Sequence, residues 1–180
     1  MRRHRTRPDA DLAARALAGD RAAMGALLDR HYDLMFRVAF RALGRRDAAE
    51  DVAQDVCVKL ARGLANWSRE GRFETWLYRV VLNAAHDAGR RLARDGRLRD
   101  EWAREPRETV TGSDDDRADT MWRAVRRLPP AQAEAITLVY GEGLSHAEAA
   151  ATMGCATATV GYHVHAARTR LREMMEEEAA

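Results

Sequence analysis

Trp67–Arg94 reads WSREGRFETWLYRVVLNAAHDAGRRLAR and carries the strongest helical signal in the chain. At about 3.6 residues per turn, its large apolar side chains gather on one side of a helix. They are Phe73, Trp76, Leu77, Val80, Val81, Ala84 and Ala88. The other side carries hydrogen-bond donors, namely Arg79, Asn83, His86 and Arg90. Such a face suits phosphates and base edges, although a solvated surface opposite a core stripe has the same composition.

The composition bounds the class of protein. A chain of 180 residues forms one modest domain or two small ones, and a net charge of +2 indicates no partner by itself. Cys57 and Cys155 lie far apart in apolar contexts, which predicts buried thiols and a reducing compartment. No apolar run approaches the roughly 20 residues of a membrane span. The basic segment Met1–Pro8 lacks the apolar core of a secretion signal, so we expect a flexible arm there.

The periodicity is helical along the whole chain and predicts an all-α fold. A short helix is expected over Asp9–Ala18 and ends at Gly19. Asp20 is expected to cap a longer helix that stops near Gly44. The inward residues of this longer helix are predicted to be Ala23, Leu27, Leu28, Tyr32, Met35, Phe36, Ala39, Phe40 and Leu43.

A third helix, about Asp47 to Gly63, has an apolar face and an acidic face. The apolar face is predicted to comprise Ala49, Val52, Ala53, Val56, Cys57, Leu60 and Leu64. The opposite face holds Asp51, Gln54, Asp55, Val58 and Arg62. An exposed valine is commonplace on its own, but a valine within this acidic stripe indicates a protein-binding surface. The fourth helix lies within the Trp67–Arg94 stretch and follows a loop that contains Trp67 and Gly71.

From about Asp95 to Arg117 the periodicity disappears. This segment contains glycines, a proline and the run Ser113-Asp114-Asp115-Asp116, with few large apolar residues. Such a composition is typical of an extended or disordered linker. The sequence therefore predicts two small helical domains, residues 1–94 and 118–180, joined by a flexible acidic linker at 95–117.

The second domain contains the pattern of a helix-turn-helix. Helices are expected over Asp119–Leu128 and Ala131–Tyr140, on either side of Pro129-Pro130. A capping box, Ser145-His146-Ala147-Glu148, then opens a short helix that ends at Gly154. A last helix follows from Thr157 or Thr159 to about Glu176. A short capped helix, a turn and a longer helix are typical of DNA-binding proteins, while a helical hairpin without a DNA role has the same local pattern.

The last helix has an inward and an outward stripe. The inward residues are predicted to be Val160, Val164, Ala167, Leu171 and Met174. The outward, DNA-facing set is Gly161, Tyr162, His163, His165, Ala166, Thr169 and Arg172, with Arg168 and Arg170 also available for phosphates. His163 and His165 with Cys155 raise the question of a metal site, but residues two apart on a helix point in different directions, so we predict none.

Four segments in this order and spacing resemble one protein family. The first half carries the resemblance in LLDRHYDLMFRVAFRALG, DAAEDVAQDVCVKLARGL and RFETWLYRVVLNAAHDAGRR. The second half carries it in LPPAQAEAITLVYGEGLSHAEAAATMGCATATVGYHVHAARTRLR. Together with the acidic linker they resemble a bacterial RNA polymerase sigma factor of the extracytoplasmic-function (ECF) group, over nearly the whole chain.

The resemblance implies a promoter-specificity subunit that works in the cytoplasm with core RNA polymerase and promoter DNA. The first domain would open the −10 element and the second would dock on the −35 element. The face with Val58 would bind the polymerase clamp. The flipped base of the melted strand would lie against Trp67, Val80 and Asn83, and backbone phosphates against Arg79, His86, Arg90 and Arg91. An anti-sigma factor, membrane-bound for many members, is implied as a further partner.

The sequence departs from the family at several positions. Many relatives have basic residues where Gly161, His163 and Ala166 stand, and an arginine at Ala133, so contact with the −35 element is expected to rest on DNA shape and phosphates. The alternatives are a stand-alone helix-turn-helix regulator and a metal enzyme using His86-Asp87, which lacks the second carboxylate cluster such chemistry needs. We expect no catalytic residues, no metal, no cofactor and no small-molecule substrate.

Overall fold

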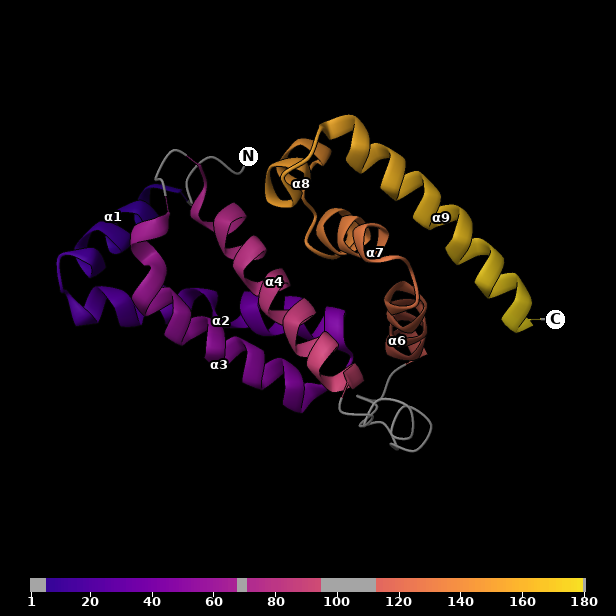
Figure 1. The fold of residues 1–180 in the computed structure, drawn as a ribbon, viewed down its shortest axis with the longest axis horizontal. Coiled ribbons are helices and arrows are strands. Elements are labelled where there is room, and N and C mark those ends of the chain that lie inside the picture. The colour runs from indigo at the N-terminus through magenta and orange to yellow at the C-terminus, as the bar shows by residue number, and fades with distance from the viewer. Residues whose placement is uncertain (1–5, 68–70, 95–112, 180) are drawn as a thin grey trace.

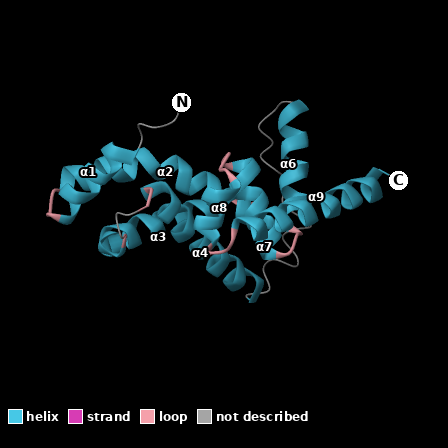
Figure 2. Cartoon of the chain, turned by 90° about the horizontal axis from the view of Figure 1, so that it is seen from above, coloured by secondary structure: helices cyan, strands magenta, loops and turns pink. Residues whose placement is uncertain are grey.

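The computed structural model describes residues 6–67, 71–94 and 113–179, and within these ranges every regular element is a helix (Figures 1 and 2). In the first half these are α1 (Thr6–Leu17), α2 (Arg21–Leu43), α3 (Arg46–Gly63), the 3-10 turn η1 (Leu64–Asn66) and α4 (Phe73–Arg94). In the second half they are α6 (Ser113–Arg126), α7 (Pro130–Ile136), the π-helical turn η2 (Thr137–Gly141), α8 (His146–Met153) and α9 (Thr157–Ala179). The all-α prediction is confirmed.

The predicted helix ends agree with the caps in the structure. The Asp20 side chain accepts a hydrogen bond from the Ala23 amide at 3.0 Å, which satisfies a donor that the first turn of α2 leaves free. Gly44 ends α2 in the left-handed conformation, at φ 70°. The capping box between Ser145 and Glu148 is formed in both directions at the start of α8. The helix-turn-helix of α8 and α9 is therefore present.

Two boundaries differ from the prediction. The segment Ser113–Arg117 was assigned to the linker, but α6 begins at Ser113. A serine followed by three aspartates is a favourable helix start, because serine is a preferred capping type and acidic types suit the positive end of the helix dipole. At the other end of the chain, α1 begins at Thr6, within the segment expected to be a flexible arm. Residues 95–112, the rest of the predicted linker, lie outside the described residues.

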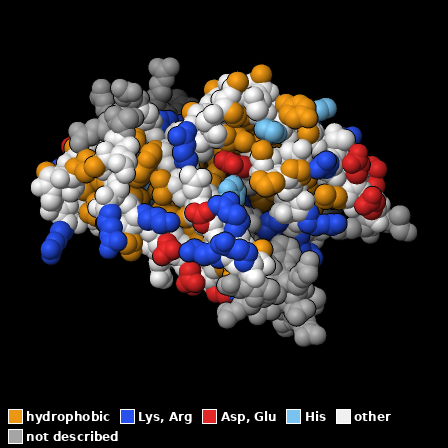
Figure 3. All heavy atoms as spheres, viewed as in Figure 1, with side chains coloured by type: hydrophobic (Ala, Val, Ile, Leu, Met, Phe, Trp, Pro, Cys, Tyr) orange, Lys and Arg blue, Asp and Glu red, His pale blue; other side chains and the backbone are white. Residues whose placement is uncertain are grey.

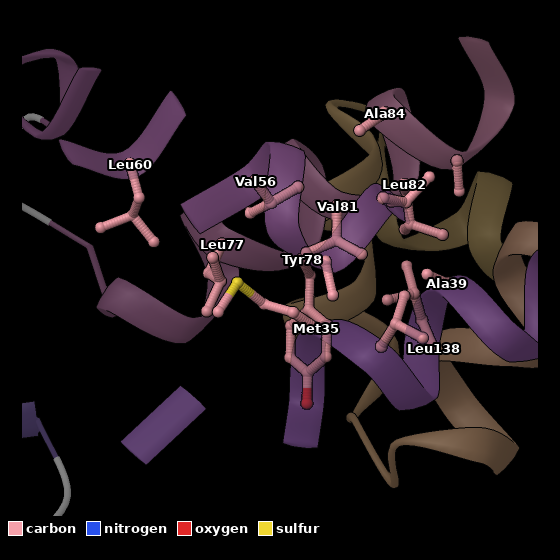
Figure 4. Packing of buried hydrophobic residues seen from close by; sticks show 14 of the residues in the cluster. Met35, Ala39, Val56, Leu60, Leu77, Tyr78, Val81, Leu82, Ala84 and Leu138 are labelled. Carbon is pink, nitrogen blue, oxygen red and sulfur yellow. The ribbon is translucent and has the colours of Figure 1, made fainter. Parts of the chain in front are cut away.

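Helices α2, α3 and α4 bury their apolar faces against one another. Met35 of α2, Val56 and Leu60 of α3, and Leu77 and Val81 of α4 meet in this core (Figure 4). Each of these side chains is fully removed from water. Burying a side chain of this size contributes roughly 1.5–3 kcal/mol of hydrophobic free energy. The inward face predicted for α4 is confirmed at five positions, whereas Trp76 and Val80 are only half-buried; the five are Phe73, Leu77, Val81, Ala84 and Ala88.

The two halves of the chain share one buried cluster. Leu138 of the π-helical turn lies near Ala39 of α2 (Figure 4) and belongs to the same cluster as Leu77 and Val81. Ala149 and Ala150 of α8 join this cluster as well. A second, smaller cluster lies within the second half between α6, α7 and α9. The second half is therefore packed against α4 and α2 instead of standing apart on a tether.

An ion pair with a buried carboxylate joins α1 to α2. Asp9 accepts a hydrogen bond from Arg30 Nη1 at 2.6 Å, and its other oxygen lies 3.3 Å from His31 Nε2 without the alignment of a hydrogen bond. Burial lowers the pKa of His31 below its usual 6.5 and outweighs the raising effect of Asp9. The folded chain therefore favours the neutral imidazole.

The lowered pKa of His31 makes stability depend on pH. Below about pH 6.5 the unfolded chain binds a proton at His31 more readily than the folded chain does, so the free energy of unfolding falls as the solution is acidified. The loss from this residue grows as the pH falls, because the unfolded chain takes up the proton that the buried imidazole resists. Urea titrations at pH 7.5 and 5.5 would show a larger loss for the wild type than for His31→Gln. Equal losses would assign the pH dependence to other groups.

Candidate nucleic-acid interface

The outer face of α4 carries the basic residues that the sequence places near the −10 element. In Figure 3, arginine and lysine side chains gather over the C-terminal half of α4. Asn83, Arg90 and Arg91 are exposed, and His86 is half-buried. Arg90 is also paired with Asp87 one turn earlier, an exposed ion pair of small energetic value. This part of the predicted DNA face is open to solvent.

Arg79 is exposed but already has partners. Its Nε donates to the Thr152 carbonyl at 2.9 Å, and its Nη2 donates to the Ala151 carbonyl at 2.5 Å. These two carbonyls lie in the last turn of α8, where helix carbonyls lack partners within the helix and the dipole is negative. Arg79 therefore caps α8. This contact is not predictable from the sequence, because the partner of Arg79 is backbone from the other half of the chain.

A second contact between the halves surrounds Glu142, directly after the π-helical turn. Its carboxylate accepts hydrogen bonds from Arg37 at 2.7 Å, from Arg41 and from the Tyr78 hydroxyl at 3.1 Å. The Glu142 side chain is only 2% exposed. Burial, with the nearby Glu142 charge, raises the pKa of Tyr78, so the phenol stays protonated and donates. We call Glu142 with Arg37, Arg41 and Tyr78 the Glu142 clasp.

Close packing around the clasp depends on glycine. A Cβ atom at Gly141 would come within 2.9 Å of the Trp122 ring and 3.0 Å of Arg41 Nη1. The Arg41 guanidinium also stacks over Trp122, with its carbon 4.9 Å from the ring centroid. Sequence reasoning did not identify the clasp. The available signal was a single glutamate between Gly141 and Gly143, together with arginines four residues apart on α2.

Trp67, which the resemblance assigns to the −10 site, lies in the core of the structure. The indole is 5% exposed and belongs to the main core, where its ring meets Phe73 edge-on at 5.3 Å between centroids. In this conformation, a ring so nearly buried offers little surface on which a base could stack. The large apolar surface of Trp67 favours this position at the junction of η1 and α4, and its role in the structure is to fill the core.

The remaining −10 candidate, Val80, is half-buried beside the core. It follows Arg79, whose guanidinium reaches α8 in the second half of the chain. Glu134 of α7 is close enough for its charge to interact with Arg79, His86 and the His163 ring. Burial raises the pKa of Glu134, and the neighbouring His86, Arg79 and His163 oppose that rise. Arg79 and His86 of the predicted DNA face therefore lie within electrostatic range of α7.

The acidic face of α3 is open to solvent. Asp51, Gln54, Asp55, Val58 and Arg62 are all exposed, and Val58 is 52% exposed. No side-chain hydrogen bond or ion pair joins these five residues to other described residues. An exposed branched apolar residue within a band of carboxylates is available to a protein partner.

The outward face of α9 is also open. Tyr162 is 67% exposed, and His165, Thr169 and Arg172 are exposed beside it. Gly161, His163 and Ala166 are half-buried, because this side of the helix is close to α8 and α7. His163 is thus half-buried, although the sequence predicts that it faces DNA. The first turns of α9, which face base edges in a helix-turn-helix, present Tyr162 as their most prominent side chain.

Within residues 6–67, 71–94 and 113–179, no group of three or more histidine, cysteine, aspartate or glutamate side chains is placed to hold a metal ion. Cys57 and Cys155 are both free thiols, and burial raises the pKa of Cys57. No helix within these ranges is both long and apolar enough to cross a membrane.

Comparison with known proteins gives a consistent result over both halves. Residues 27–95 match the Sigma-70 region 2 family, and residues 118–171 match the Sigma-70 region 4 family. The chain is 33% identical to the ECF RNA polymerase sigma factor SigE of Mycolicibacterium smegmatis, over 90% of this chain and 66% of the relative. It is 32% identical to the ECF RNA polymerase sigma factor SigM of Mycobacterium tuberculosis, over 94% of this chain and 85% of the relative.

Among solved structures, the chain resembles CnrH in complex with the cytosolic domain of CnrY. The TM-score is 0.70 and the identity 27%, with 94% of this chain and 98% of CnrH covered. Region 2 corresponds to the helices that contain the basic α4 face, and region 4 to the helices that contain the helix-turn-helix. The chain therefore belongs to the sigma-70 family, in its ECF group of RNA polymerase sigma factors.

Proposed function

We propose that this protein directs core RNA polymerase to promoters through three surfaces and has no catalytic activity of its own. The observation that carries the proposal is that region 2 and region 4 sequences occur in tandem, with an exposed acidic α3, a basic α4 and an open α9. Residues 1–94 form the polymerase and −10 domain, residues 118–180 form the −35 domain, and 95–117 connect them. The protein acts in the cytoplasm, where core polymerase and promoter DNA are found.

The α3 face is the proposed contact with core polymerase. It consists of Asp51, Gln54, Asp55, Val58 and Arg62, all exposed on one side of the helix. Charged residues at the edge of such an interface steer association, while the apolar residue at its centre supplies affinity. Val58 is that central residue, because it is the exposed large hydrophobic side chain of α3.

Val58→Glu is expected to weaken binding to core polymerase about tenfold or more, because it buries an unpaired charge at the interface. The affinity of labelled chain for core polymerase measures the effect. Ala26→Glu is the matched control, since Ala26 is an exposed helical residue on α2 outside the proposed face. Unchanged affinity of Val58→Glu would remove α3 from the interface.

The α4 face is the proposed site for the melted −10 strand. Asn83 is exposed for a base edge, with Val80 beside it, and Arg79, His86, Arg90 and Arg91 supply cations for phosphates. Extruding a base from the duplex costs a few kcal/mol of stacking energy. Hydrogen bonds to the edge of the base and contacts with its face must offset this loss. The resemblance also assigns Trp67 to this site, and its ring lies in the core of the described residues.

The α9 face is the proposed contact with the −35 element. Tyr162, His165, Thr169 and Arg172 are its exposed members, with Gly161, His163 and Ala166 at its half-buried edge. Few of these side chains are strong direct readers of base edges. The proposed recognition therefore relies on phosphates and on the shape of the duplex. An anti-sigma factor is a further proposed partner, because the solved neighbour CnrH is in a complex with the cytosolic domain of CnrY.

In vitro transcription from a genomic library tests the proposed function. Core polymerase is incubated with and without the purified chain, and transcript starts are mapped. New start sites that depend on the chain are the expected result. A chain that shifts duplex DNA alone but gives no new start sites would instead be a stand-alone regulator.

A further inference from the structure

The first turns of α9, residues 157–167, form the part of the helix-turn-helix that meets base edges. They contain no arginine, lysine, asparagine or glutamine, which are the residue types that commonly read guanine and adenine in the major groove. Ala158, Tyr162 and His165 are exposed along one side of the helix. Thr169 continues the same stripe one turn further on. Direct reading of bases by this helix therefore relies mainly on apolar surface.

Tyr162 offers the largest apolar surface on this stripe. The residue is 67% exposed, and its ring meets the His163 imidazole with the centroids 5.6 Å apart and the ring planes inclined at 63°. His163 is itself half-buried, so it supports the phenol ring from the protein side. This contact limits the conformations of Tyr162 before DNA arrives. A side chain that is ordered in advance loses less conformational entropy when it binds.

The polar groups that follow Tyr162 along α9 are poorly placed to read guanine. The Thr169 hydroxyl donates to the His165 carbonyl at 3.3 Å, so its proton is used within the helix. Arg172 follows Tyr162 by ten residues, which is about 15 Å along the helix axis at about 1.5 Å per residue. An arginine so far from the N-terminal turns is placed for backbone phosphates instead of base edges.

Thymine is the base whose major-groove edge suits such a surface. It carries a C5 methyl group in the groove, and this methyl group makes apolar contacts with aromatic, threonine and alanine side chains. Guanine, adenine and cytosine present acceptors and donors at their edges. These polar groups would lose their water against a phenol ring without gaining a matched partner, which is unfavourable. A ring at the position of Tyr162 therefore favours thymine.

We propose that Tyr162 is a specificity-determining residue whose ring docks against the methyl group of a thymine in the −35 element. The inference rests on the proposed function, in which the α9 face meets that element. Phosphate contacts and the shape of the duplex supply the affinity, and the Tyr162 contact sets which base pair is accepted at one position. The element that this chain prefers therefore contains an A·T pair opposite Tyr162.

Holoenzyme assembled from core polymerase and the full chain tests the inference on a promoter from the genomic-library assay, with its −35 region randomised. The wild type is expected to select an A·T pair at one position where Tyr162→Ala accepts any pair. Deoxyuridine in place of that thymine removes only the methyl group. This change is expected to lower the transcript yield of the wild type about fourfold, the equivalent of burying one methyl group. Tyr162→Ala should transcribe both templates equally, whereas Tyr162→Phe, which retains the ring, should keep the preference for thymine.

Tyr140→Ala is the matched control, because Tyr140 is another exposed tyrosine of the second half, on the π-helical turn and outside α9. Its preference for thymine over deoxyuridine should match that of the wild type. Thermal melting verifies that each variant folds. A wild type without a thymine preference, or a Tyr162→Ala variant that keeps it, would overturn the inference while leaving the proposed function in place. A wild type that gives no transcript from any genomic promoter would remove the proposed function as well.

Discussion

Trp67→Ala is expected to lower the free energy of unfolding by about 3–5 kcal/mol. The indole is almost completely buried and contacts Phe73, so truncation leaves a cavity among residues that cannot fully collapse into it. A loss of this size is comparable to the total stability of a small domain, which is about 5–15 kcal/mol. Urea unfolding followed by far-ultraviolet circular dichroism measures the effect.

Trp67→Phe separates packing from base contact. Phenylalanine keeps an aromatic ring in the core, so most of the stability is expected to return together with activity. The core assignment is contradicted if Trp67→Ala unfolds at the wild-type urea concentration but fails to form open complexes. In that case the ring would belong to the DNA site, as the family resemblance implied.

Asn83→Ala is expected to reduce open-complex formation by about 10- to 100-fold, with little change in stability. The amide is exposed, and none of the hydrogen bonds between described residues involves it, so its removal leaves the fold intact. Hydrogen bonds between an amide side chain and a base edge discriminate by about 1–3 kcal/mol, which corresponds to the expected factor. Heparin-resistant complexes on a promoter found by the transcription assay provide the measurement.

The same variant contains its own control. Affinity for core polymerase and the thermal midpoint of Asn83→Ala should match the wild type, because α3 lies on a different surface from Asn83. A parallel loss of polymerase binding would indicate misfolding. Open complexes at the wild-type level would exclude Asn83 from the −10 site.

The helices and their caps were predictable from the sequence because their determinants are local. Asp20 and Ser145 act on amides within one turn, and Gly44 ends α2 through its own backbone conformation. The start of α6 was missed because an acidic run was interpreted by composition alone, although the same residues favour a helix start.

The contact between the domains was not predictable from a single helical period. Tyr78, Leu82 and Ala85 of α4 are buried in addition to the predicted stripe. They are on the parts of the helix surface that the rest of the chain covers, and periodicity within α4 does not reveal a partner more than 50 residues away in sequence. The residue types of α4 were enough to predict the candidate DNA face. The hydrogen bonds from Arg79 to α8 were not predictable, because their acceptors lie far away in sequence.

Permanganate footprinting of a promoter located by the transcription assay is the most direct measurement of promoter opening by this chain. Unpaired thymines are expected around the −10 element only when core polymerase and the chain are both present, and they should weaken sharply with Asn83→Ala. Thymines that stay unreactive with both components present, on DNA that the chain alone binds as a duplex, would contradict a sigma factor that opens promoters.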